Sequence, residues 1–128
     1  MSFQPPAHRL FVPLKSSPFA AFLDGSKTWE LRKRHPRWTR THVFVGRRVE
    51  LRCGYRVGKS LWGQIVAVDD ASSVDQMFAR IGYKPFVPRA ASSAQALRIA
   101  EETMGSADQP VIAFQVALDM RQIGRAHV

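Results

Sequence analysis

Three charged side chains follow a glycine at short spacing near the start of the chain: Lys27, Glu30 and Arg32, after Gly25. A glutamate can accept hydrogen bonds from the amino group of a base, while lysine and arginine can bind phosphate or carbonyl oxygen atoms. The spacing therefore predicts a pocket for a base or a nucleoside. The alternative is an ion-pair network in which Glu30 binds Arg32, Lys27 or Lys15 and closes one end of the fold without a ligand.

Two strands and a short helix are expected to position these side chains. Alternating residues predict strands over residues 9–14 and 27–34, and the helix between them begins at the Ser16–Ser17 pair and ends at Gly25. Strand alternation places Lys27 on the face opposite Glu30 and Arg32, unless the chain twists or bulges at its first residue.

The rest of the chain predicts three more strands and two helices. The strands are expected over Arg48–Cys53, Leu61–Val68 and Val111–Met120, and the helices over Val74–Ile81 and Ser92–Met104. An exposed loop over His35–His42 and a polar break over Asp69–Ser73 are expected between them. Because strands and helices do not alternate regularly, the order favours an α+β fold, a small, mostly antiparallel β-barrel with helices packed on its openings. The 128 residues, 45% of them hydrophobic, fit a single domain whose core covers about residues 9–120.

The net charge of +9 is concentrated in the first half of the chain. Residues 1–56 contain twelve Lys or Arg and three Asp or Glu, whereas residues 57–128 contain seven of each. Such a field attracts a polyanion, and nucleic acid is the usual intracellular one. The alternatives are a solvated basic surface that only confers solubility and a module that binds an acidic protein. Besides Lys15, the candidate phosphate contacts are Arg32, Arg34, Arg37, Arg40, Arg47 and Arg48.

Aromatic residues beside these charges favour RNA or single strands over a duplex. Trp38 lies between Arg37 and Arg40 in a loop that contains a proline, so it is expected to be exposed and to stack on an unpaired base. Tyr83 is expected to line the far rim of the site, with the alternative that it anchors its loop.

Other classes of site find no support in the sequence. A single cysteine, Cys53, excludes an internal disulfide framework and a Cys-rich zinc site, and the spacing of His35 and His42 matches no zinc motif. We therefore expect no metal and no cofactor. No apolar run is long enough for a membrane span, and the first ten residues lack the apolar core of a secretory signal, so a cytoplasmic protein without a membrane partner is expected.

The octapeptide GSKTWELR resembles a known family signature. Gly25, Lys27, Glu30 and Arg32 match, position for position, the Gly-x-Lys-x-x-Glu-x-Arg pattern of the ASCH domain family in the PUA-like superfamily. The segments VGRRVEL and LWGQIVAV resemble the strands that follow in the family, and the similarity spans Arg9 to Leu118, although an arginine, Arg47, stands where the family often has Asp. The resemblance implies a PUA-like barrel and an RNA- or nucleic-acid-binding function.

The same family also implies an enzyme alternative. One bacterial branch hydrolyses acetylated cytidine, which implies a Lys base, a Thr nucleophile and a downstream Glu. Lys27 matches the lysine, but Glu30 stands at the position of the threonine, and Thr28 lies at a different step of the strand. This leaves, as the alternative, a hydrolase of a modified nucleoside or a ribonuclease in which Lys27 and Glu30 act on water. The sequence determines neither the oligomeric state nor the choice between RNA and DNA.

Overall fold

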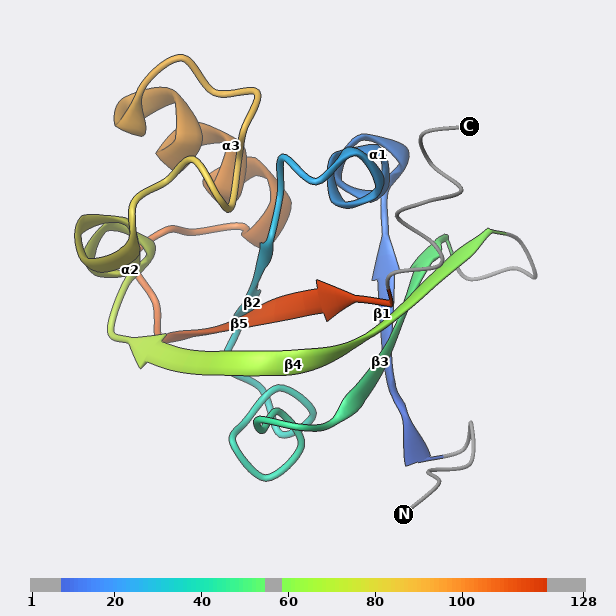
Figure 1. Cartoon of the computed structure of the whole chain (residues 1–128). Helices are drawn as coiled ribbons and strands as arrows, with labels where there is room; N and C mark the ends of the chain where they lie inside the picture. Colours follow the sequence, from blue (N-terminus) through green and yellow to red (C-terminus); the bar gives the residue numbers. More distant parts are fainter. Residues whose placement is uncertain (1–7, 55–58, 120–128) are drawn as a thin grey trace.

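The computed structural model describes residues 8–54 and 59–119 and shows one curved sheet with three helices (Figure 1). The strands are β1 (Leu10–Leu14), β2 (Trp29–Lys33), β3 (Arg48–Cys53), β4 (Ser60–Ala71) and β5 (Val111–Leu118). The helices are α1 (Ser16–Asp24), α2 (Val74–Ile81) and α3 (Ser93–Met104). The element order and the α+β fold predicted from the sequence are confirmed.

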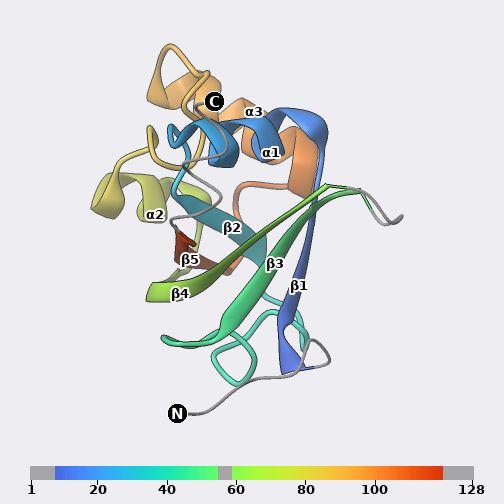
Figure 2. The same cartoon turned by 45° about the vertical axis from the view of Figure 1, so that its right-hand side comes forward.

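The strands are ordered β1-β3-β4-β5-β2, and only β1 and β3 run parallel among the described pairs. A parallel pair needs a long crossover connection, which α1, β2 and the loop after β2 supply here. The sheet curls into a half-barrel, so that its two edge strands, β1 and β2, face one another below α1 (Figure 2). This arrangement confirms a small, mostly antiparallel, PUA-like barrel.

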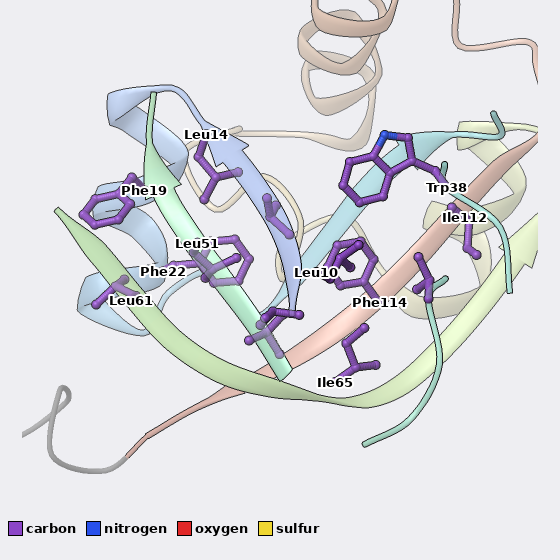
Figure 3. Packing of buried hydrophobic residues seen from close by; sticks show 14 residues of the cluster. Leu10, Leu14, Phe19, Phe22, Trp38, Leu51, Leu61, Ile65, Ile112 and Phe114 are labelled. Carbon is purple, nitrogen blue, oxygen red and sulfur yellow. The ribbon is translucent and has the colours of Figure 1, made fainter. Parts of the chain in front are cut away.

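The concave side of the sheet holds the inner core. Alternate residues of β1, β3, β4 and β5 point into it, as period-two burial requires. Two aromatic residues of α1, Phe19 and Phe22, cover the end at which β1 finishes and β2 begins (Figure 3). The largest strand residues of this core with no exposed surface are Phe114 of β5, Leu51 of β3 and Ile65 of β4.

A second core lies between the opposite face of the sheet and the two later helices. Val111 and Ala113 alternate with the inner-core residues of β5 and pack against α2 and α3, with Trp29 and Leu31 of β2 beside them. Each of these helices is preceded by an N-cap serine, Ser73 before α2 and Ser92 before α3. The hydroxyl of each serine accepts a hydrogen bond from the backbone N–H three residues later, and such a cap contributes about 1 kcal/mol. No described helix is long and apolar enough to cross a membrane.

Two predicted boundaries are wrong. The first helix has its N-cap at Lys15, and Ser16 and Ser17 are already helical, so neither serine caps it. The polar break expected from Asp69 begins only after Ala71. Asp69 and Asp70 still pair with β5 and belong to the end of the long strand β4. Their carboxylates remain at the surface, where arginines bind them, so the strand continues through polar residues.

Candidate functional site

The side chains of Lys27, Glu30 and Arg32 meet where α1 ends and β2 begins. Gly25 ends the helix with a φ of 86°, a left-handed conformation that glycine adopts without strain. The chain then turns back under the helix, and the Lys27 N–H donates to the Ala21 carbonyl at 3.0 Å. Because Lys27 lies before the first residue of β2, strand alternation does not govern it, and its side chain reaches the same side as Glu30.

We call these three side chains the Lys–Glu–Arg cluster, and their contacts form a continuous network. Lys27 Nζ donates to the Phe86 carbonyl at 2.6 Å and lies 3.3 Å from Glu30 Oε1. Arg32 donates to Glu30 Oε2 from Nε at 2.9 Å and from Nη2 at 2.7 Å. Arg32 Nη2 also donates to the carbonyl of Pro13 at 2.8 Å. Since Pro13 belongs to edge strand β1, this guanidinium joins the two edges of the half-barrel.

Burial and pairing together fix the charge states in this cluster. Lys27 is 6% exposed and Glu30 is 7% exposed. Burial lowers the pKa of Lys27, and the nearby Glu30 carboxylate offsets only part of this effect. Burial alone would raise the pKa of Glu30, but the charges and hydrogen bonds of Arg32 and Lys27 hold it below its ordinary value. Glu30 is therefore a carboxylate held between two cations.

The Lys–Glu–Arg cluster is closed in this structure. Among the described residues, no buried side-chain nitrogen or oxygen lacks a hydrogen-bond partner. A base or nucleoside would reach Lys27 and Glu30 only after their mutual contacts opened. The geometry thus agrees with the ion-pair network that the sequence analysis gave as the alternative to a nucleoside pocket.

Trp38 is buried, so its predicted exposure is wrong. Only 9% of its surface is accessible, and its indole stacks on Phe114 with a centroid distance of 6.2 Å and an interplanar angle of 8° (Figure 3). The guanidinium carbons of Arg32 and Arg37 lie 4.7 Å and 5.6 Å from the ring centroid. The loop bends inward here, and the backbone N–H of Trp38 donates to the backbone carbonyl of His35 at 2.7 Å. The indole therefore fills the open end of the inner core and offers no platform for a base.

Besides Arg32, which binds Glu30, two more of the predicted phosphate-binding arginines are paired with acids. Arg40 Nε donates to Asp70 Oδ2 at 2.8 Å, and this hydrogen bond is the main reason that the pKa of Asp70 lies below its ordinary value. Arg48 binds both carboxylate oxygens of Asp119, at 2.9 Å and 3.1 Å. Acidic residues of the second half of the chain thus neutralise part of the basic first half.

Three arginines of the segment that joins β2 to β3, residues 34–47, which we call the basic loop, have no such acid. Within the described part of the chain, no carboxylate forms an ion pair with Arg34, Arg37 or Arg47. Arg34 and Arg37 are exposed, and Arg47 donates to the main-chain carbonyls of His42 at 2.5 Å and His8 at 3.3 Å. The basic loop therefore keeps a positive charge that faces solvent.

The remaining candidates lie elsewhere. Lys15 is exposed at the start of α1, at the end of β1 opposite the basic loop (Figure 1). Tyr83 packs against the second core, with Lys84 Nζ 5.9 Å from its ring centroid, which agrees with an anchoring role. The structure does not bring these two residues together with the basic loop.

A second buried acid, Glu50, was not singled out from the sequence. Arg9 Nε donates to its Oε1 at 3.1 Å, while Arg52 Nη2 and Ser60 Oγ each donate to Oε2 at 2.6 Å. Burial would raise the pKa of Glu50, but the hydrogen bonds from Ser60, Arg52 and Arg9 hold it below its ordinary value. Glu50 is 3% exposed although it lies on the outer face of β3, because these side chains cover it. Alternation in RVELRC, which puts Arg48, Glu50 and Arg52 on one face, was the available signal.

No metal centre is found in the part of the chain that the structure describes, since no three His, Cys, Asp or Glu side chains come together there.

Comparison with known proteins identifies the fold. No protein-family model and no curated protein matches the sequence. Among solved structures, hypothetical protein PH0355 superposes with a TM-score of 0.71 over 85% of this chain and 97% of its own, at 16% identity. Protein PF0455 from Pyrococcus furiosus gives 0.64 over 86% and 96%, at 15% identity. ASCH from Zymomonas mobilis gives 0.57 over 90% and 76%, at 19% identity. The chain has the ASCH fold.

This result confirms the fold that the octapeptide resemblance implied. In this ASCH fold the four signature residues occupy the junction of α1 and β2, where Gly25 ends the helix and the three charged side chains join the sheet edges. At 15–19% identity the likeness concerns the fold alone.

Proposed function

We propose that this protein binds nucleic acid through phosphate contacts of the basic loop, with RNA or another single strand favoured over a duplex. The observation that carries the proposal is that Arg34, Arg37 and Arg47 form no ion pair with a carboxylate in the described structure, whereas the other arginines near them do. Arg34 interacts with Asp70 only through the longer-range effect of its charge, which helps to lower the pKa of Asp70. Guanidinium groups that face solvent without a counter-charge can replace the cations condensed on a phosphate backbone, and the release of those cations drives binding.

The shape of the basic loop supports a flexible strand as ligand. The backbone of the loop curves around one end of the half-barrel and does not follow a straight line (Figure 2). A duplex stays straight over a length far greater than this molecule, whereas a single strand can bend to follow the loop. The burial of Trp38 removes base stacking on that residue from the proposal, which now depends on phosphate contacts.

A hydrolase is the weaker candidate. Glu30 is held between two cations with a lowered pKa, so it is a poor proton acceptor, and its side chain is almost fully covered. Incubation with N-acylated nucleosides and with RNA is expected to give no turnover. Turnover that disappears in Lys27→Met would favour the enzyme instead.

Binding measured against salt tests the proposal. A labelled twelve-nucleotide RNA, the same sequence as single-stranded DNA, and the corresponding duplex are titrated between 50 and 200 mM salt. Three phosphate contacts on a single strand predict a slope of about −2 for log K against log salt. A slope near zero would contradict the proposal, as would equally tight binding of poly-glutamate, which would instead indicate an acidic protein partner.

A further inference from the structure

A pocket of about 210 Å³ is formed by residues at the start of β1 and in the basic loop. These two segments lie at the end of the sheet opposite α1 (Figure 1). The lining residues of the pocket are Arg9, Leu10, Phe11, Arg37, His42 and Arg47. It is separate from the Lys–Glu–Arg cluster, none of whose residues lines it. None of the described residues that line it is acidic, although three are arginines.

Two of the three guanidinium groups are held by hydrogen bonds before any ligand arrives. Arg9 Nε donates to Glu50 Oε1 at 3.1 Å, and because Arg52 also pairs with Glu50, these three side chains keep a net positive charge. Arg47 donates to the carbonyls of His42 and His8. Arg37 lies over the ring of Trp38, 5.6 Å from its centroid. Because a guanidinium has five N–H groups, each of these arginines retains donors beyond the contacts that position it. Fixed donors lose less side-chain entropy when they bind an anion.

The size and charge of the pocket indicate the chemical class of its ligand. A volume of about 210 Å³ is well above that of one water molecule, but it is below the roughly 300 Å³ at which pockets begin to enclose a whole small molecule. A tetrahedral oxyanion fits such a space, and arginines bind phosphate oxygens through paired N–H groups. Arg47 is partly buried, and this desolvation of its charge lowers its pKa, so contact with an anion would favour the charged form.

We propose that this pocket binds a phosphate group of a nucleic-acid strand through Arg9, Arg37 and Arg47, while the rest of the strand lies outside it along the basic loop. This inference rests on the proposed function and adds the place where one phosphate is seated. The phosphate belongs either to the terminus of a strand or to its interior, because in both places its non-bridging oxygens can accept hydrogen bonds from arginine.

The test compares two arginine-to-glutamine variants that change the net charge equally. Arg37→Gln removes a donor whose side chain is exposed and forms no described ion pair, so the fold should persist. Arg98→Gln on α3, also exposed, is the matched control far from the pocket. Thermal denaturation first verifies that both variants fold. Each is then titrated with a 3′-labelled RNA decamer carrying either a 5′-phosphate or a 5′-hydroxyl.

We expect Arg37→Gln to weaken RNA binding about tenfold, since charge-assisted hydrogen bonds to phosphate are the strong ones, and Arg98→Gln by less than about twofold. Arg37→Lys should recover only part of the loss, because lysine lacks the fork of donors. A preference for the 5′-phosphate that disappears in Arg37→Gln assigns the pocket to a strand terminus. Equal binding of both decamers, weakened equally, assigns it to an interior phosphate.

Other outcomes separate this inference from the proposed function. If the decamers bind with a steep salt dependence but Arg37→Gln behaves like Arg98→Gln, the pocket assignment is overturned and nucleic-acid binding stands. A second measurement follows backbone amide NMR signals during titration with inorganic phosphate at constant ionic strength. If phosphate shifts the signals of the pocket residues in the wild type but not in Arg37→Gln, and no decamer binds, the pocket stands and the proposed function fails.

Discussion

The Lys–Glu–Arg cluster and the basic loop follow each other in the sequence and both contain arginine, but they differ in what surrounds their charges. Lys27 and Glu30 adjoin the inner core, where an unpaired charge is costly, and each has its partner there. Arg34 and Arg37 lie in solvent, where hydration stabilises a charge without a partner. The comparison teaches that charges beside the core are paired with one another and join the edges of the sheet, while the charges of Arg34 and Arg37 face solvent without an ion pair.

Trp38 belongs to the basic loop but is buried beside Arg32 of the Lys–Glu–Arg cluster, and its removal should have the largest effect. If Trp38 were a stacking residue on an exposed loop, its replacement by alanine would not affect stability. Because the indole is buried and packed on Phe114, its removal leaves a cavity at the open end of the inner core. We expect Trp38→Ala to lower the free energy of unfolding by about 3–5 kcal/mol in urea denaturation. Trp38→Phe, which keeps a ring on Phe114, should lose clearly less. A loss below about 1 kcal/mol for the alanine variant would show that the loop does not depend on this contact.

Neutralising Glu30 should have the next largest effect and should not alter RNA binding by the folded protein. Glu30→Gln keeps the shape of the side chain but leaves Lys27 and Arg32 without their counter-charge. Removing one partner of a buried ion pair costs about 3–5 kcal/mol, and we expect about 3 because Arg32 is partly exposed. Urea unfolding measures the loss, and anisotropy under native conditions measures the binding. Weaker binding without a loss of stability would place Glu30 in a ligand site.

Acid should reduce the difference in the free energy of unfolding between the wild type and Glu30→Gln. The folded-state pKa of Glu30 lies below its ordinary value of 4.5, so the unfolded chain binds the proton first as the pH falls. The stabilisation by the carboxylate is therefore fully present above pH 4.5 and is lost as the pH falls through the folded-state pKa. The wild type should lose stability in this range while Glu30→Gln, whose amide does not titrate, loses less. Glu50, whose pKa is also lowered, titrates in both proteins and so does not change the difference between them. Parallel curves of unfolding free energy against pH would show that the Glu30 charge contributes nothing to stability.

The parts of the fold that were predictable are those set by local periodicity. The helix Val74–Ile81 and the strand Arg48–Cys53 agree with the prediction residue for residue, because alternation and spacing of apolar residues determine them. The octapeptide indicated the ASCH fold because it combines a helix-ending glycine with fixed charges. A side chain that is buried from a loop has no periodic neighbours in the sequence to indicate its burial. Trp38 was therefore expected at the surface, although it is buried.

Charge pairing was the least predictable part of the candidate site. Asp70 and Asp119 lie far along the chain from Arg40 and Arg48, so only the tertiary fold brings each pair together. The same holds for Glu50, which binds Arg9 across 41 residues of sequence. The sequence could count the excess of arginines, but the tertiary fold determines which of them keep their charge available.

The smallest expected effect comes from deleting a charge pair without changing the net charge. The double substitution Arg40→Gln with Asp70→Asn removes an ion pair whose side chains are 55% and 35% exposed, and such pairs contribute only about 0–1 kcal/mol. RNA affinity should stay within about twofold of the wild type, because Arg40 already has its counter-charge. Arg34→Gln, by contrast, removes an arginine without an ion pair and should reduce the salt slope by about 0.7, the amount expected for one phosphate contact on a single strand. If the double variant loses as much affinity and slope as Arg34→Gln, Arg40 contacts phosphate despite Asp70, and pairing does not decide which arginines bind.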